Sequence, residues 1–136
     1  MIEPNLVKLM SPTDQAYYRE LGLIPDPAKQ AKTLKRNEIQ QQRAFSRLMT
    51  QRRIPFINPR ADQKSTIAVG HPDFTIFLPH GRMFMIEMKA PGGRFSPEQI
   101  GRIEALRALG HLVEIAWSAD EAWKMTLREY EKATLT

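Results

Sequence analysis

Residues 73–89 read DFTIFLPHGRMFMIEMK, which is two apolar strand patterns separated by Pro79-His80-Gly81. Residues 73–78 are rich in the β-branched and aromatic residues that favour strands. Pro79 suits the second position of a type I turn, and Gly81 suits the left-handed position that closes a three-residue loop. The stretch therefore predicts a β-hairpin.

The three-residue loop sets which residues face each other across this hairpin. Leu78 then lies opposite Arg82, and Asp73 lies opposite Glu87. Opposed Cβ atoms are roughly 5 Å apart, which suits two carboxylates that share one cation. Strand alternation places Glu87 and Lys89 on the same face. The alternative is a surface hairpin with solvated charges, since Asp followed by Glu-x-Lys also recurs by chance.

Two carboxylates and one lysine in this arrangement suit a metal-dependent site that cuts phosphodiester bonds. Carboxylates bind a hard cation such as Mg²⁺, which activates water and screens the charge of a phosphate. The lysine can orient that water or stabilise the developing negative charge. We therefore predict Asp73, Glu87 and Lys89 as catalytic residues, with Mg²⁺ as the cofactor and Mn²⁺ as a substitute.

A helix is predicted from Glu38 to about Arg53, with Asn37 as its N-cap. Glu38 shares a helical face with the apolar Phe45 and Met49, so it should point toward the core. Two explanations of Glu38 are open. It can favour the helix dipole from the first turn, or it can be a third acid directed at the metal site.

A second helix is predicted to start at Ser96, the N-cap, with Pro97 in the first helical position and Gln99 completing a capping box. The capping box by itself explains Gln99. In the preceding loop, Gly93 lets the backbone approach a phosphate closely, and Arg94 offers a charged fork. An ordinary flexible loop is the alternative explanation.

The remaining elements follow from local patterns. Pro55 places a first strand at a sheet edge. Ser118 begins a capping box for the final helix. The full set is a short helix from Ser11 to Gly22, a linker at Pro25–Pro27, a strand at residues 54–57, a polar loop at residues 58–69, a strand at residues 112–117 and a last helix after Ser118.

Four segments share one family pattern: GHPD at residues 70–73, EMKA at 87–90, GGRFSPEQ at 92–99 and GHLV at 110–113. In order and spacing they resemble the VRR-NUC domain, the virus-type replication-repair nuclease branch of the PD-(D/E)xK superfamily. The resemblance covers about Glu38 to Trp123. It implies an α/β fold with a restriction-endonuclease-like core, in which a mixed, mainly antiparallel sheet is flanked by helices. Residues 1–36 would form an N-terminal arm and residues 37–136 the nuclease domain.

The resemblance also implies roles for individual residues. It implies metal ligation by Asp73, Glu87 and the backbone carbonyl of Met88, with Lys89 assisting catalysis. It further implies that Glu38 and Gln99 are accessory catalytic residues. Small stand-alone members of the family resemble dimeric nucleases similar to Holliday-junction resolvases. A homodimer acting on branched DNA is therefore expected.

Composition limits the other functions. The chain has 136 residues, no cysteine and three histidines without zinc-ligand spacing. No apolar run reaches the ~20 residues needed to cross a membrane. Glu3, Pro4 and Asn5 interrupt any signal peptide. One cytoplasmic domain is expected, in contact with the nucleoid of a bacterial or phage-type host cell.

The net charge of +5 is concentrated in one region. Residues 29–64 contain ten Lys and Arg but only two acids. Arg36, Arg43 and Arg47 share one helical face there, which favours a patch that binds phosphate backbones. We predict these three arginines, with Gly93 and Arg94, as DNA-binding residues. The alternative explanation is that these arginines are ordinary basic residues on a solvated helix face and do not bind DNA.

The sequence therefore predicts a metal-dependent DNA endonuclease that hydrolyses phosphodiester bonds, with selectivity for branched DNA such as Holliday junctions. One competing function is a DNA-binding module on the same fold that does not turn over. Another is a nuclease subunit that acts only beside a helicase or repair partner, since the chain contains no helicase motif.

Overall fold

The computed structural model describes residues 1–59 and 69–135, so most of the predicted polar loop at residues 58–69 lies outside the described residues. The described strands form one sheet in the order β1-β2-β3-β4: β1 (Phe56–Ile57), β2 (Phe74–Phe77), β3 (Met83–Met88) and β4 (Val113–Ala116). The first three strands are antiparallel neighbours, and β4 runs parallel to β3. This confirms the mixed, mainly antiparallel sheet. Pro55 precedes an edge strand, as predicted.

The hairpin register agrees with the sequence prediction. Phe77 pairs with Met83, and Phe74 pairs with Ile86. One step further along this register, Asp73 comes opposite Glu87.

The loop of the hairpin is a 3-10 turn, η1 (Pro79–Gly81), in which Gly81 has the expected left-handed backbone at φ 71°. The predicted type I turn is wrong, because His80 is also left-handed at φ 62° where that turn needs about −90°.

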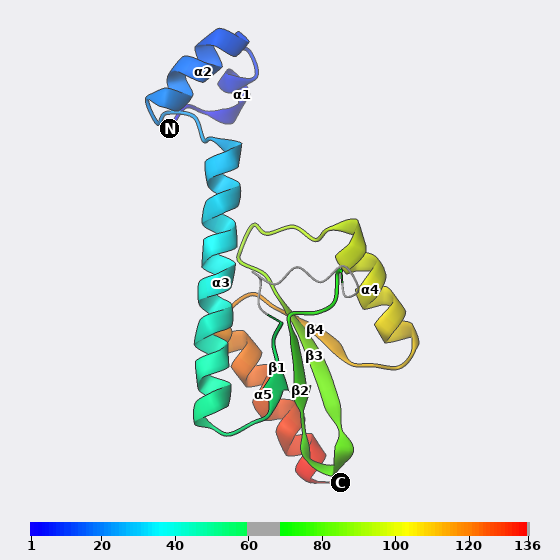
Figure 1. Cartoon of the computed structure of the whole chain (residues 1–136). Coiled ribbons are helices and arrows are strands. Elements are labelled where there is room, and N and C mark those ends of the chain that lie inside the picture. Colours follow the sequence, from blue (N-terminus) through cyan, green and yellow to red (C-terminus); the bar gives the residue numbers. More distant parts are fainter. Residues whose placement is uncertain (60–68, 136) are drawn as a thin grey trace.

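Helices cover both faces of the sheet (Figure 1). On one face, α3 (Pro27–Gln51) and α5 (Ala119–Thr134) pack on a core that contains Phe45, Phe74 and Ile86. On the other face, α4 (Pro97–Ala108) packs through Ile103 on Met85 and Val113. Alternation along β3 separates the two cores, so Glu87 and Lys89 share the α4 face with Met85.

Helix α3 starts earlier than predicted. It begins at Pro27, and its N-cap is Asp26, whose Oδ1 accepts a hydrogen bond from the Ala28 N–H at 3.0 Å. Proline is favoured in the first helical position, so Pro27 is part of the helix and not of a linker. Asn37 lies inside α3 and is not a cap. The predicted domain boundary after residue 36 falls inside this helix and stays a prediction.

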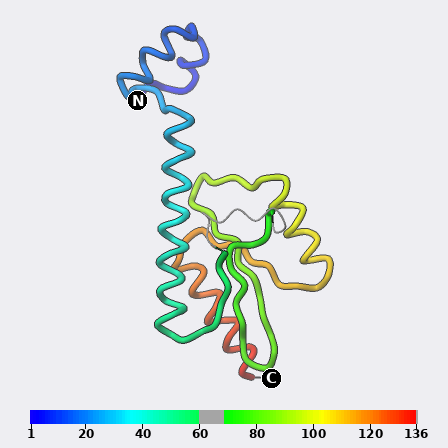
Figure 2. The backbone as a smooth tube through the Cα atoms, in the orientation of Figure 1, coloured from blue at the N-terminus to red at the C-terminus, as the bar shows by residue number. Residues whose placement is uncertain are grey.

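The N-terminal residues form a small helical head at the far end of α3 (Figures 1 and 2). It consists of α1 (Pro4–Val7), which the sequence did not predict, and α2 (Pro12–Glu20), which it did. Ser11 caps α2 by accepting a hydrogen bond from Asp14, and Gly22 follows the helix with φ 75°.

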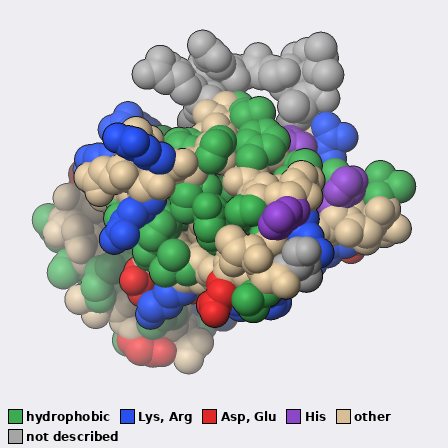
Figure 3. Space-filling view, turned by 90° about the horizontal axis from the view of Figure 1, so that it is seen from below, with side chains coloured by type: hydrophobic (Ala, Val, Ile, Leu, Met, Phe, Trp, Pro, Cys, Tyr) green, Lys and Arg blue, Asp and Glu red, His purple; other side chains and the backbone are tan. Residues whose placement is uncertain are grey.

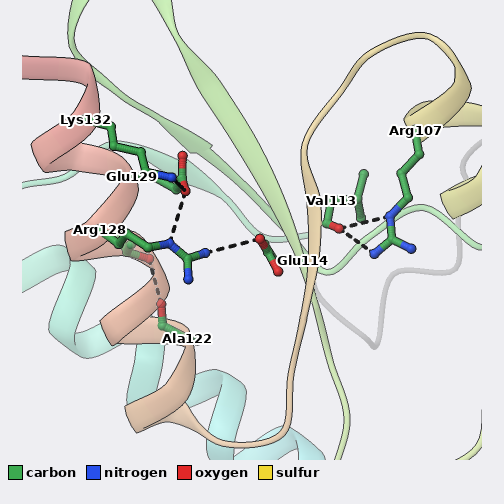
Figure 4. A network of polar contacts seen from close by, with 8 residues as sticks. Arg107, Val113, Glu114, Ala122, Arg128, Glu129 and Lys132 are labelled. Carbon is green, nitrogen blue, oxygen red and sulfur yellow. Dashed lines mark hydrogen bonds and ion pairs between the residues drawn. The ribbon is translucent and has the colours of Figure 1, made fainter.

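Polar contacts fix β4 to its flanking helices (Figure 4). Arg107 of α4 donates from Nη2 to the carbonyl oxygen of Val113 at 2.7 Å. Arg128 of α5 donates to Glu114 at 3.2 Å. These contacts hold α4 and α5 against the strand that neighbours β3.

Some apolar surface is left uncovered. Hydrophobic side chains gather on the lower face of the molecule (Figure 3). Ile57, Phe77 and Met83 are exposed on the β-strands. No helix in the described part of the chain is long and apolar enough to cross a membrane.

Candidate active site

The predicted site residues converge where β3 ends. Glu87 is the last but one residue of β3, and Lys89 follows the strand. Both side chains are buried, with Glu87 0% and Lys89 6% exposed. Asp73 comes from the residue before β2, and Gln99 comes from the first turn of α4.

Gln99 connects the two buried charges. Its Nε2 donates to Glu87 Oε1 at 2.9 Å, and its Oε1 accepts from Lys89 Nζ at 2.9 Å. The same Oε1 also accepts from the Ser96 N–H at 2.9 Å, and the Gln99 N–H donates to Ser96 Oγ at 3.1 Å. The predicted capping box is confirmed, and it orients the amide so that its N–H₂ group points at Glu87. Gln99 is therefore both a cap and a member of the site.

Asp73 is fixed by its backbone surroundings. Its Oδ2 accepts a hydrogen bond from the Met88 N–H at 2.9 Å. Just before it, Gly70 has φ 78° and packs on the start of α4, where an added Cβ would lie 2.4 Å from the Glu98 carbonyl oxygen. Only glycine fits this close contact, which seats the segment that leads to Asp73 against α4.

Glu38 reaches the site from α3. It is 7% exposed, and its Oε1 lies 3.6 Å from Lys35 Nζ. Burial is the main cause of the raised pKa values of Asp73 and Glu87, and the charge of Glu38 raises both further. Because α3 begins at Pro27, Glu38 is not in its first turn, so the helix-dipole explanation no longer applies.

The electrostatics show an excess of negative charge. Burial, and then the charge of Asp73, raise the pKa of Glu87 from 4.5 to about 8, although Lys89 opposes the shift. Burial also raises the pKa of Asp73 against the opposing hydrogen bond from Met88. Glu87 Oε2 is buried and accepts no hydrogen bond from any described residue, and a hydrogen bond between the Glu87 and Asp73 carboxyl groups raises the pKa of Glu87 further. A bound cation would relieve all three features.

The donors here fit Mg²⁺. Among the described residues, no group of three or more His, Cys, Asp or Glu side chains is arranged around a common metal position. Mg²⁺ does not require such a group, because it is usually held by one or two carboxylates while waters and substrate phosphates complete its shell. Asp73, Glu87 and the Met88 carbonyl supply oxygen donors of this kind, and Glu87 Oε2 is unsatisfied.

A cleft of about 620 Å³ is lined by Glu38 and Lys89 of the site, whereas Asp73 and Glu87 are not part of its lining. One wall is the N-terminal half of α3, with Leu34, Lys35 and Glu38, and Lys89 lies between the walls. The other wall is the loop of residues 92–94, so the predicted Gly93 and Arg94 both line the cleft. At Gly93 a Cβ would lie 2.9 Å from the Ala90 carbonyl oxygen, so this tight turn needs glycine.

The other three predicted DNA-binding residues lie elsewhere. Arg36, Arg43 and Arg47 are exposed on α3, and none of them lines this cleft. A helix turns about 100° per residue, which puts each of them about 140–180° around α3 from Glu38. The structure does not bring them together with the catalytic residues.

Two residues near the site were not predicted. Lys35 lines the cleft, and its spacing of three from Glu38 was a usable signal, because such residues are helical neighbours. Phe95 has its ring centre 5.1 Å from Lys89 Nζ and packs edge-on against Trp117. Lys89 is thus held between this ring and Gln99. No pattern in the sequence identified Phe95.

Comparison with known proteins agrees with these observations. The model of the VRR-NUC domain family matches residues 28–120. The chain is also 41% identical over 51 residues to "Putative nuclease p44" of Acyrthosiphon pisum secondary endosymbiont phage 1, which is 38% of this chain and 55% of the phage protein. The chain thus spans about half the length of that relative. No solved structure matches significantly.

The family match starts ten residues before the resemblance seen in the sequence, and these residues form the cleft wall of α3. The fold is the mixed sheet flanked by helices that a PD-(D/E)xK-like core requires. Family and relative both support a nuclease. With more than half of its length matched, the chain belongs to the VRR-NUC domain family.

Proposed function

We propose that this protein is a Mg²⁺-dependent endonuclease that hydrolyses phosphodiester bonds in branched DNA. The observation that supports this most is that the amide of Gln99 joins Glu87 to Lys89, while the Met88 N–H holds Asp73, beside a cleft with cationic walls. The raised pKa values of the two buried carboxyl groups also support a bound cation, because a cation stabilises the charged forms of both.

Each residue has a distinct role in this proposal. Asp73, Glu87 and the Met88 carbonyl would hold the cation. When bound, Mg²⁺, or Mn²⁺ in its place, lowers the pKa of water and screens the phosphate charge. Lys89 uses one of its three N–H donors on Gln99, and the others orient the attacking water or stabilise negative charge on the phosphate.

The supporting residues keep these groups in place. Gln99 fixes the orientation of the Glu87 carboxylate and of the Lys89 amine. Glu38 lies on the cleft wall contributed by α3, where its carboxylate would accept hydrogen bonds from water that enters the cleft. Lys35 and Arg94 stand on opposite walls and hold the phosphate backbone of the strand that is cut.

We also propose that the substrate is branched DNA and that the protein acts as a homodimer. Family resemblance supports both. A four-way junction has two-fold symmetry, which suits a two-fold dimer with two active sites. The phage origin of the relative is compatible with action on DNA in the cytoplasm of a bacterial cell.

Two alternatives use the same fold. A DNA-binding module without turnover would have no need of a buried lysine hydrogen-bonded to the site, so the contacts of Lys89 disfavour it. A nuclease subunit that needs a helicase or repair partner would keep every residue above and differ only in its requirement for that partner.

A substrate panel tests the proposal. The purified protein is incubated with labelled four-way junction, flap, single-stranded and duplex DNA, in Mg²⁺, Mn²⁺ or EDTA. We expect cutting with either cation and none in EDTA, fastest on the four-way junction and as paired nicks. Tight binding without cutting on any substrate would instead favour the binding module or the partner-dependent subunit.

A further inference from the structure

Helix α3 has a second charged side that the site does not use. An α-helix turns by about 100° per residue. By this measure, five of the six Lys and Arg residues in α3 lie about 120–180° around the helix axis from Glu38. We call this stripe the outer basic face, and it consists of Lys29, Lys32, Arg36, Arg43 and Arg47. Lys35 is the one cation of α3 that lines the cleft, and it also borders the hollow beside the outer basic face.

The outer basic face is exposed and has no neutralising partner among the described residues. All five residues are exposed, and within the part of the chain that the structure describes their side chains make no ion pair or side-chain hydrogen bond. The core packs on only one side of α3 (Figure 1). The single acid in this helix, Glu38, is buried and points into the cleft.

The spacing of these charges is unfavourable for the helix itself. Lys32 with Arg36, and Arg43 with Arg47, are like-charged pairs four residues apart, and such pairs destabilise a helix by roughly 0.2–0.5 kcal/mol each. A solvated helix face would normally alternate acids with bases. A continuous cationic stripe without acids is therefore better explained by an anionic partner.

The dimensions of the stripe fit duplex DNA. From Lys29 to Arg47 it is about 27 Å long, since a helix rises about 1.5 Å per residue. A hollow of about 500 Å³ lies along it, and its lining includes Lys32, Arg36 and Arg43 of the stripe as well as Lys35. At about 3.4 Å per base pair, the stripe matches about eight base pairs of duplex.

Even a duplex that seated its major groove, about 12 Å wide, over α3 would leave the side of the helix that carries Glu38 against the core. The cleft and the outer basic face are separated by the thickness of a helix, about 10–12 Å with its side chains. Duplex DNA stays stiff over about 150 base pairs, so it does not wrap around such a narrow object. Two arms that diverge from a branch point can lie on the two sides of the helix.

We propose that the outer basic face binds the phosphate backbone of a second duplex arm of branched DNA while the cleft holds the arm that is cut, with α3 between them. This inference rests on the proposed nuclease function and gives its preference for branched DNA a structural basis. The arginines predicted to bind DNA would then do so at a different place from the active site.

The test compares a variant of the stripe with a matched control. The test variant combines Arg36→Gln, Arg43→Gln and Arg47→Gln, since glutamine is a good helix former and all three sites are exposed. The control variant removes the same charge at three exposed cations outside α3, by Lys8→Gln, Arg82→Gln and Lys124→Gln. Circular dichroism and thermal melting verify that both variants fold.

Binding is measured by fluorescence anisotropy in EDTA, with a labelled four-way junction and a straight duplex of equal length, over a series of salt concentrations. We expect the test variant to lose at least tenfold more affinity for the junction than for the duplex. Its salt slope on the junction should fall by about 2.7, at about 0.9 for each phosphate that the variant no longer neutralises. The control variant should keep the wild-type ratio of the two affinities.

Three results would overturn the inference. Equal losses on junction and duplex would mean that the stripe contacts the arm in the cleft. No change on either DNA would mean that the stripe does not bind DNA. A change from dimer to monomer in the test variant, seen by light scattering, would assign the stripe to contact with a second copy. If the junction-specific loss is found but the wild type cuts nothing in Mg²⁺, the proposed nuclease function fails and the arm-binding inference stands.

Discussion

Gln99 donates a hydrogen bond from its side-chain amide to the buried carboxylate of Glu87 at 2.9 Å. The donor stands in the first turn of α4 and the acceptor near the end of β3, so a helix cap and a strand end are joined at the site. The orientation of Glu87 therefore depends on how α4 begins.

Gln99→Ala should slow cleavage by roughly 10–100-fold and raise the Mg²⁺ concentration needed, as is usual when a residue that orients a metal ligand is removed. The measurement is cleavage rate against Mg²⁺ concentration. Ser96→Ala is the matched control, because it removes the Ser96 Oγ cap but leaves both the Ser96 N–H and Glu87 contacts of Gln99 possible. Equal effects of the two variants would mean that Gln99 acts only as a cap.

Lys89→Ala should reduce cutting by at least about 100-fold, a loss typical of removing one group that stabilises the transition state. Binding of the four-way junction in EDTA should change little, because Lys35 and Arg94 remain on the cleft walls. Gel assays of cutting and anisotropy of binding separate the two effects. Equal loss of both in a folded variant would count against the role assigned to Lys89.

The metal-free protein should become less stable as pH rises. The folded pKa of Glu87 is raised from 4.5 to about 8, so between these values the folded state holds a proton that the unfolded state has released. The free energy of unfolding then falls with rising pH by up to about 1.4 kcal/mol per pH unit for one proton, and the effect ends above pH 8.

Melting curves in EDTA between pH 5 and 9, for wild type and Glu87→Gln, measure this effect. The variant should have a shallower slope and a higher melting temperature than wild type at pH 8, because glutamine puts no charge in the buried position. Saturating Mg²⁺ should remove most of the difference. The same slope in both proteins would show that Glu87 is not the group that titrates.

Lys35→Gln should weaken binding of duplex and junction DNA alike, by about tenfold or less, because Lys35 lines the cleft that both would enter. The melting temperature should hardly change, since its ion pair with Glu38 is largely solvent-exposed at Lys35 and such pairs contribute about 0–1 kcal/mol. Anisotropy with both DNAs is the measurement. A loss confined to the junction would place Lys35 with the outer basic face instead.

The hairpin and the start of α4 were predictable because their determinants are local. A three-residue loop and strand alternation set the pairing of Phe74 with Ile86, and hence the approach of Asp73 to Glu87. The Ser96 and Gln99 capping box needs only a spacing of three. The turn at His80 was predicted wrongly, because a left-handed backbone at a residue other than glycine leaves little trace in the sequence.

The start of α3 was missed for a tertiary reason. The segment from Pro27 to Asn37 extends beyond the sheet, so it lacks the apolar stripe that marks a packed helix. Its N-cap Asp26 and its first residue Pro27 are also residue types that suit a linker. Helical spacing alone places Arg36 on the opposite side of α3 from Glu38. That spacing separates Arg36 from the active site only because the structure shows that Glu38 faces the cleft.

The central claim is that Asp73 and Glu87 form a cation site that cuts DNA. Its most direct test is single-turnover cleavage of a labelled four-way junction in Mg²⁺ by wild type and Glu87→Gln, with the exposed Glu104→Gln as control and Mg²⁺ binding followed by calorimetry. We predict that Glu87→Gln alone loses both Mg²⁺ binding and cutting while it still folds and binds the junction. Cutting at the wild-type rate by Glu87→Gln would contradict the account.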